Sequence, residues 1–190
     1  MKKSIFTVLL GASLIALISG CSQQKEEVAA SDINVGIILG FTGPIESLTP
    51  TMASSAEMAF KEATDAGVLN GSTLNPVRAD STCIDAAAAT SAAERLVTAD
   101  NVAAIMGADC SGVTTAIANN VAVPNGVTII SPSATSPALT TIEDKGFFFR
   151  TAPSDARQGQ VLAQVVMDRG VKKLAVTYTN NDYGKGLSDS

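Results

Sequence analysis

Three short segments of the sequence are rich in glycine and hydroxyl side chains and poor in charge. They are residues 40–44 (GFTGP), 107–112 (GADCSG) and 131–137 (SPSATSP). Hydroxyl groups and free backbone N–H groups bind small polar ligands, such as carboxylates and ammonium groups. We therefore take these segments as the candidate binding residues of the chain.

Ser111 is the residue on which this chemistry depends most. The sequence predicts a helix from Ser111 to about Val121, and the first turn of a helix presents unpaired N–H groups and the positive end of its dipole. A hydroxyl at that position suits a ligand carboxylate, and Ser133 and Thr135 can add contacts to a carboxylate or an ammonium group. The alternative is that Ser111 only caps its helix and that residues 131–137 form a surface loop.

The sequence offers little to support catalysis or metal binding. It contains no His, which excludes Ser-His-Asp and Cys-His catalysis and every His-based metal site. Ser111 is not in a GxSxG nucleophile elbow, because Asp109 and Val113 stand where glycine is required. Asp80, Asp85 and Asp109 are scattered near expected strand ends, where lone carboxylates usually cap helices or form turns. We therefore expect a protein that is not an enzyme and that uses no cofactor or metal.

Net charge and aromatic content limit the possible partners. The chain has 13 Lys and Arg against 18 Asp and Glu, a formal net charge of −5, and only 4% of its residues are aromatic. A nucleic-acid-binding surface needs a basic patch or aromatic stacking platforms, and neither is available here. We expect no nucleic-acid partner.

The start of the chain has the pattern of an export signal. Two lysines precede an apolar run of 14 residues over 5–18, which is shorter than the ~20 residues that a membrane-spanning helix needs. The small residues before Cys21 resemble the bacterial lipobox. This pattern predicts a lipoprotein signal peptide at residues 1–20, lipidation of Cys21, and a polar tether over 21–32. The alternatives are an ordinary cleaved signal and a true membrane anchor.

Export also bears on the remaining cysteines. With Cys21 assigned to lipid, Cys83 and Cys110 are an even pair in a chain sent to an oxidising compartment, which favours a disulfide over two free thiols. We expect the protein in the periplasm or cell envelope, attached to the membrane only through its lipid.

After residue 32, short β-branched runs alternate with Ala-rich helical stretches. This rhythm predicts strands at 33–39, 74–79, 102–106, 127–130 and 173–179, and helices at 50–66, 86–99, 111–121 and 155–169, with Thr49, Asp85 and Ser154 as N-caps. Such alternation indicates an α/β fold, a doubly wound parallel sheet covered by helices on both faces. The three candidate segments would then meet at the carboxyl edge of the sheet, where ligands bind in open parallel sheets.

The rhythm restarts after Arg150, so the sequence predicts two units. Residues 33–150 form an N-terminal α/β lobe, and residues 151–190 begin a second lobe. After residue 186 another helix is due and is not expected to form before Ser190. We therefore expect the sequence to be an N-terminal fragment.

Several ordered motifs carry a family resemblance from Ile33 to the end of the chain. They are "INVGIILGFTGP", the pair "DSTCID" and "GADCSG", "ISPSATSPALT", "FRTAPSDARQGQ" and "NNDYGKG". The sequence resembles the type I periplasmic binding proteins of branched-chain amino-acid ABC transporters, the leucine/isoleucine/valine-binding group. The resemblance implies two α/β lobes that close on a ligand held in the cleft between them.

The same resemblance implies roles for individual residues. It implies a disulfide between Cys83 and Cys110, and an amino-acid carboxylate held by Ser111 and Thr135. The ammonium group would meet the Ser133 backbone carbonyl and the Thr135 hydroxyl. The resemblance places Ala134 among the ligand-binding residues, and Tyr183 as an aromatic that closes over the ligand from the second lobe. Leu48 departs from the aromatic residue that the family often has there, so the side-chain pocket differs.

These observations predict a lipid-anchored solute-binding protein of an ABC importer. Its partners would be an amino acid, most naturally an aliphatic one, and the ABC permease and ATPase complex. The alternatives are a ligand-sensing regulatory protein of the same fold, for amides or amino acids, and an importer receptor for short amides, urea or aromatic acids.

Overall fold

The computed structural model describes residues 30–190 as a parallel sheet with helices packed against it. The predicted signal peptide, the lipidation site Cys21 and most of the tether lie outside the described residues. The strands are β1 (Asp32–Leu39), β2 (Thr73–Asp80), β3 (Ala104–Gly107), β4 (Thr128–Ser131) and β5 (Phe148–Arg150). They pair in parallel in the order β2-β1-β3-β4-β5.

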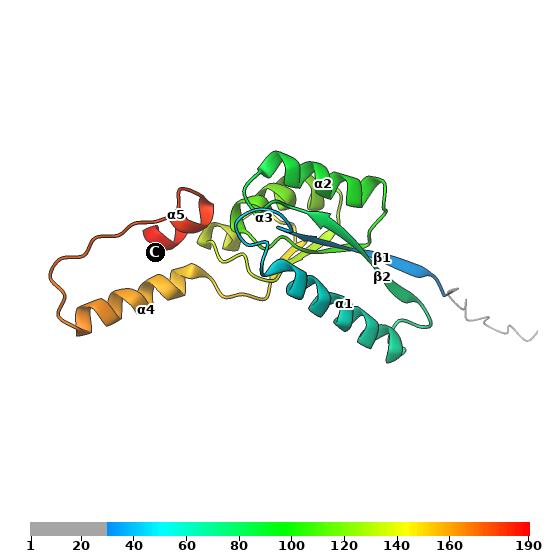
Figure 1. Cartoon of the computed structure of the whole chain (residues 1–190), viewed down its shortest axis with the longest axis horizontal. Helices are drawn as coiled ribbons and strands as arrows, with labels where there is room; N and C mark the ends of the chain where they lie inside the picture. The colour runs from blue at the N-terminus through cyan, green and yellow to red at the C-terminus, as the bar shows by residue number, and fades with distance from the viewer. Residues whose placement is uncertain (1–29) are drawn as a thin grey trace, which may run out of the picture.

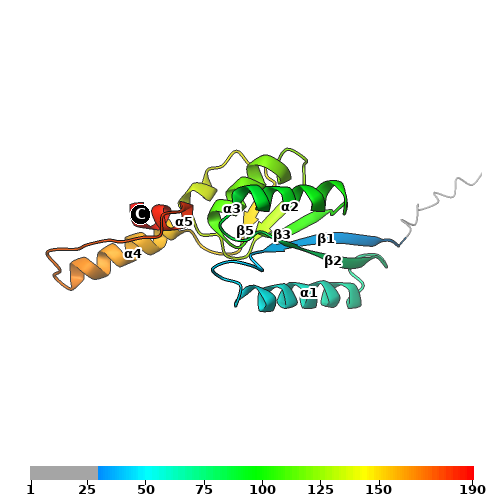
Figure 2. The same ribbon diagram turned by 45° about the horizontal axis from the view of Figure 1, so that its top comes forward.

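Helices cover both faces of this sheet, as the sequence predicts (Figure 2). Helix α1 (Thr49–Asp65) lies on one face, where it packs against Ile37 and Leu39. Helices α2 (Ala86–Thr98) and α3 (Ser111–Ile117), with the π-helical turn η1 (Ala118–Ala122), lie on the other, where Ile38 and Ile105 are buried. Successive residues of β1 point to opposite faces, so a strand buried on both sides has a continuous apolar sequence. The predicted doubly wound fold is confirmed.

The direction of winding reverses between β1 and β3. The chain runs outward from β1 to β2, returns to β3 beside β1, and then continues through β4 to β5. In such sheets the loops at the carboxyl ends separate at the point of reversal, and ligands bind there. The loops after β1, β3 and β4 are therefore placed around the site that the sequence predicts.

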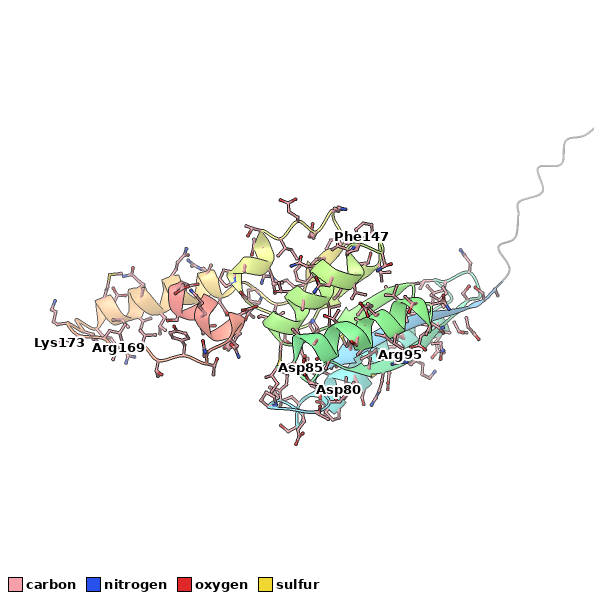
Figure 3. All side chains as sticks on the ribbon, turned by 90° about the horizontal axis from the view of Figure 1, so that it is seen from above. Asp80, Asp85, Arg95, Phe147, Arg169 and Lys173 are labelled. Carbon is pink, nitrogen blue, oxygen red and sulfur yellow. A yellow bond between two sulfur atoms is a disulfide. The ribbon has the colours of Figure 1, made fainter. Side chains whose placement is uncertain are left out.

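Residues 151–190 leave the sheet as a separate arm, which we call the α4–α5 arm (Figure 1). It contains α4 (Asp155–Asp168) and α5 (Asp182–Asp189). Val161, Leu162 and Val165 are 41–57% exposed, so the apolar stripe of α4 has no cover among the described residues. Arg169 lies at the far end of the arm (Figure 3).

Two expectations for the arm are wrong. Residues 173–179 form no strand and are exposed, because no described strand lies beside them to supply hydrogen-bond partners. The helix that was not expected at the end of the chain is present as α5. The Asn181 side chain begins this helix by accepting a hydrogen bond from the Gly184 N–H at 2.8 Å.

Two of the three N-cap residues predicted from the sequence cap their helices in the structure. Asp85 accepts hydrogen bonds from two N–H groups of α2, and Ser154 accepts one from Ala156, so both predicted caps are confirmed. The predicted cap at Thr49 is wrong, because Leu48 occupies that position. The Thr49 hydroxyl is fully buried and instead donates to the Gly40 carbonyl at 3.1 Å, which joins α1 to the loop after β1.

Candidate ligand-binding site

Asp109 joins the loops that follow the first three strands. Its carboxylate accepts hydrogen bonds from the Gly40 N–H at 2.8 Å, the Cys110 N–H at 3.0 Å and the Ser81 hydroxyl at 3.4 Å. The side chain is buried, with 4% exposure. The interpretation of Asp109 as a helix cap or surface turn is therefore wrong. A buried carboxylate needs several donors, and here those donors come from three different loops.

The disulfide between Cys83 and Cys110 is confirmed, with the two Cα atoms 5.2 Å apart. Cys83 lies between β2 and α2, and Cys110 is the N-cap residue of α3. The bond therefore attaches the start of α3 to the neighbouring loop. Ser111 follows Cys110 directly, so its position is fixed by a covalent link one residue away.

The segment 131–137 folds against the start of α3 rather than forming a free surface loop. The Ser136 N–H donates to the Ser111 hydroxyl at 3.2 Å, and the Ser133 hydroxyl donates to the Asp109 carbonyl at 2.9 Å. Ala134 is fully buried, and its N–H donates to the Ser131 hydroxyl at 3.0 Å. The N-cap residue of α3 is Cys110, and the Ser111 hydroxyl instead accepts from the Ser136 N–H, so the alternative that Ser111 only caps its helix is wrong.

Thr135 is held from both sides by residues that the sequence analysis missed. Arg150 donates to the carbonyl oxygens of Ala134 at 3.3 Å and Ser136 at 2.8 Å, the residues on either side of Thr135. The Thr135 hydroxyl donates to the Asp155 carboxylate at 2.8 Å. Arg150 ends β5 and Asp155 begins α4, but the sequence carries no local signal for either role, because β5 is only three residues long.

The structure brings Ser111, Ser133, Ala134 and Thr135 together, and Tyr183 lies on a neighbouring helix. Helix α5 packs against α3 and the 3₁₀ turn η2 (Pro137–Thr140). Tyr183 is 44% exposed and makes no hydrogen bond to the other four predicted residues. A cavity of about 390 Å³ opens between Thr135 and α4, and none of the other predicted site residues lines it.

The surroundings of the site contain no cluster that would hold a metal. Among residues 30–190, no group of three His, Cys, Asp or Glu side chains is arranged to bind a metal ion. Within the same range, no helix combines the length and apolar character needed to cross a membrane. What the site presents is a set of hydroxyl and backbone groups, of the kind that contact small polar ligands.

Asp80, at the end of β2, accepts hydrogen bonds from the loop after β1. Burial raises the pKa of its carboxyl, but hydrogen bonds from the Thr42 hydroxyl and from the N–H groups of Thr82, Thr42 and Phe41 outweigh that effect. The pKa therefore lies below its ordinary value. The loop after β1 is thus attached to β2 by a charged group. Figure 3 shows Asp80 near Asp85, at the start of α2.

The lowered pKa of Asp80 predicts a pH-dependent stability. Asp80 ionises at about pH 4 in the unfolded chain and at a lower pH in the folded one. The contribution of ionised Asp80 to the free energy of unfolding is therefore complete above about pH 4. It is lost as the pH falls through the folded-state pKa. We expect Asp80→Asn to be less stable than the wild type at neutral pH, with a difference that closes in acid. Urea unfolding across this range measures the effect.

Asp65→Asn is the matched control for the Asp80 variant, because Asp65 pairs only with the exposed Lys61 one helical turn away. A stability difference for Asp80→Asn that is the same at neutral and acid pH contradicts the assigned role of its carboxylate.

Comparison with known proteins identifies the family. A family model described as "Periplasmic binding protein" matches residues 32–190. Leu/Ile/Val-binding protein homolog 1 of Brucella melitensis is 35% identical over 192 residues, which cover 100% of this chain and 48% of that protein. Leucine-specific-binding protein of Salmonella typhimurium is 28% identical, with 100% and 49% covered. The chain spans about half the length of these curated relatives.

Solved structures agree with this comparison. The branched-chain amino acid transporter substrate-binding protein LivJ of Streptococcus pneumoniae, in complex with isoleucine, has a TM-score of 0.73 at 30% identity, and the match covers 83% of this chain and 45% of that one. A solute-binding protein of Rhodopseudomonas palustris, in complex with 3,4-dihydroxybenzoic acid, has a TM-score of 0.71 at 21% identity, covering 83% and 42%, and shows the fold alone. The chain therefore belongs to the type I periplasmic binding proteins, in the group that includes the Leu/Ile/Val-binding proteins.

Proposed function

We propose that this chain is part of a lipid-anchored solute-binding protein that delivers an aliphatic amino acid to an ABC importer. The observation that carries the proposal is the convergence of Ser111, Ser133 and Thr135 at the carboxyl edge of the sheet, on loops joined by Asp109 and a disulfide. Rigidly placed polar groups of this kind orient a small ligand. The proposed protein is not an enzyme.

Ser111 is the proposed carboxylate contact. Its hydroxyl oxygen accepts a hydrogen bond from the Ser136 N–H, so its own proton is free to be donated to a ligand. The side chain is 2% exposed, and a hydrogen bond to a charged group gains strength where water is excluded. Ser111 therefore contributes to binding without having to change its existing contact.

The α4–α5 arm is proposed to supply the other side of the cleft. Helix α5 approaches the first turn of α3, where a Cβ atom added at Gly112 would lie 3.6 Å from the Asp182 carboxylate. Tyr183 is the next residue of α5, and we assign it to closing over the bound ligand. When the two lobes of this fold close, water leaves the cleft and the second lobe contacts the ligand.

The remaining parts of the proposal concern location and partners. Cys21 would carry the lipid that holds the protein at the membrane, in the periplasm or cell envelope. The ABC permease and its ATPase would receive the closed, ligand-loaded form. The names of the relatives support this assignment over a sensory role, because they describe binding proteins for Leu, Ile and Val.

A thermal-shift screen of the mature gene product tests the function. The panel contains leucine, isoleucine, valine, alanine, acetamide, urea and 3,4-dihydroxybenzoate. We expect an aliphatic amino acid at 100 times its Kd to stabilise the protein by about 2.7 kcal/mol. Ser111→Ala should weaken binding of that amino acid by about 1–3 kcal/mol, the range for a hydrogen bond to a charged group.

Ser54→Ala is the matched control, because the Ser54 hydroxyl bonds only to its own helix, at the Pro50 carbonyl. It should leave affinity unchanged. If only acetamide or 3,4-dihydroxybenzoate stabilises the protein, the proposal that its ligand is an amino acid is wrong. If no member of the panel stabilises it, the proposed function is contradicted.

A further inference from the structure

The sequence contains two Asn-Gly pairs, Asn70-Gly71 and Asn125-Gly126, and neither belongs to the proposed ligand site. Such a pair can lose ammonia without an enzyme, because the backbone nitrogen of the glycine can attack the side-chain amide carbon of the asparagine. Glycine has no Cβ atom to hinder this approach, and its backbone rotates freely enough for the two groups to meet. The reactivity of each pair in the folded protein therefore depends on what holds the asparagine amide and the glycine nitrogen.

Asn70 and Gly71 are the two central residues of an exposed turn between α1 and β2. Both have positive φ angles, of 51° and 87°, as the central residues of a type I′ turn do. The Ser72 N–H donates to the Leu69 carbonyl at 3.0 Å and closes the turn. Within residues 30–190, neither the Asn70 side chain nor the Gly71 N–H makes a hydrogen bond. Both reacting groups are therefore exposed, and no hydrogen bond in that range holds them apart.

Asn125 and Gly126 are exposed as well, but both of their reacting groups are held. The Asn125 side-chain amide donates to the Val121 carbonyl at 2.8 Å, and the Gly126 N–H donates to the Val123 carbonyl at 3.1 Å. Both hydrogen bonds must break before the glycine nitrogen can attack the amide carbon. Each bond that must break raises the activation barrier, so this pair reacts more slowly than a free one.

We propose that Asn70 is a site of spontaneous deamidation in the folded protein, and that Asn125 is protected. The Gly71 nitrogen forms a bond to the Asn70 Cγ atom, the C–N bond of the side-chain amide breaks, and the proton of the Gly71 N–H leaves with the ammonia. The cyclic succinimide that results takes up a water molecule and opens at either of its two carbonyl groups. One opening gives aspartate, and the other gives isoaspartate, in which the main chain runs through the side chain.

The place of Asn70 in the fold limits what this modification changes. Its turn precedes the amino edge of the sheet, where Asp32 pairs with Thr73, opposite the edge that carries the candidate ligand site (Figure 2). Next to the turn, the Ser31 N–H donates to the Ser72 hydroxyl at 3.3 Å, and the Thr73 N–H donates to the Ser31 carbonyl at 3.3 Å. Isoaspartate lengthens the main chain of the turn by a carbon atom. We therefore expect it to loosen the contacts between the starts of β1 and β2 and to leave the ligand site unchanged.

Incubation of the mature gene product at neutral pH in water enriched in oxygen-18, followed by peptide mass spectrometry, tests the proposal. Each succinimide that opens during the incubation takes up the heavy oxygen, so reaction during digestion in ordinary water is not counted. We expect the peptide with Asn70 to gain label at least about tenfold faster than the peptide with Asn125, the factor that corresponds to about one net hydrogen bond. Asn70→Gln should remove the label from the first peptide, because the longer side chain forms the corresponding ring far more slowly.

The same incubation in urea is the control, because unfolding breaks the hydrogen bonds that hold Asn125 and Gly126. The two Asn-Gly pairs should then react at similar rates. In the folded protein, equal rates, a faster reaction at Asn125 or no label at Asn70 would each overturn the inference. A difference of the same size in urea would also overturn it, because the difference would then come from the neighbouring sequence and not from the fold.

Hydrogen exchange on the incubated protein measures the consequence. The isoaspartate form should exchange its amide protons faster at residues 31–34 and 72–75, and at the same rate as the unmodified form in α3. Unchanged exchange at both strand starts, or faster exchange throughout the sheet, would contradict the local effect assigned to the turn.

Discussion

Loss of the disulfide between Cys83 and Cys110 is expected to lower the free energy of unfolding by about 3.5 kcal/mol, the chain-entropy value for a closed loop of this size. The two cysteines are 27 residues apart in sequence. Thr82 and Cys83 also have positive φ angles of 57° and 69°, a backbone conformation that non-glycine residues rarely adopt. The crosslink opposes relaxation of this loop, so its removal affects both the unfolded chain and the native site.

Urea unfolding of Cys83→Ala/Cys110→Ala, with and without dithiothreitol, measures this effect. The reductant should lower the unfolding midpoint of the wild type to about that of the double variant, and should leave the double variant unchanged. Because Cys110 precedes Ser111, we also expect weaker amino-acid binding by the double variant. A wild-type midpoint that does not respond to reductant under unfolding conditions would contradict the structural role of the bond.

The sheet could be predicted because its strands are buried on both faces. The run at 33–39, which forms β1, is apolar at nearly every position. Helix α1 is marked by a Pro at its start and a Gly just after its end. Local signals of this kind place elements to within about two residues. They also fix which loops meet, because parallel strands end at one edge of a sheet.

Residues 173–179 show where local signals fail. Their β-branched and aromatic composition favours a strand, but a strand also needs a neighbour to pair with, and pairing depends on residues far away in sequence. The described residues supply no such neighbour, and the segment is exposed. The short β5 and η2 were missed for the opposite reason, because three or four residues hold too little periodicity to detect.

The candidate site was predicted in part for a similar reason. Ser111, Ser133 and Thr135 could be named because they follow strands and have side chains suited to a ligand. Asp109, Arg150 and Asp155 could not be assigned, because all their partners except the adjacent Cys110 N–H lie 10 to 69 residues away in sequence. Nothing in a lone Asp or Arg shows whether it faces water or a set of buried donors and acceptors. The residues that position these loops are therefore harder to predict than the residues whose side chains suit a ligand.

Gly107→Ala is expected to be among the most damaging single substitutions in the chain. Gly107 ends β3 with a φ of +136°, and a Cβ atom there would lie 2.0 Å from the carbonyl oxygen of Ile38, its neighbour in β1. We expect a loss of about 4 kcal/mol in unfolding free energy, from about 2 kcal/mol of backbone strain and about 2 kcal/mol of overpacking. Gly67→Ala is the control without the steric contact, because Gly67 has a positive φ of +68°, in the less strained left-handed region, and nothing lies within 4 Å of its Cβ position. It should cost only about 1 kcal/mol.

The damage at Gly107 should extend to ligand binding. The carbonyl oxygen of Ala108, the next residue, accepts hydrogen bonds from the hydroxyls of Thr114 in α3 and Ser131 at the end of β4. Moving the backbone at Gly107 to relieve the contact with Ile38 therefore separates the two segments that carry Ser111 and Thr135. Urea unfolding and amino-acid calorimetry on both glycine variants measure the two effects. Equal stabilities for Gly107→Ala and Gly67→Ala would show that β1 and β3 can move apart freely, and that the close approach of their ends does not set the geometry of the site.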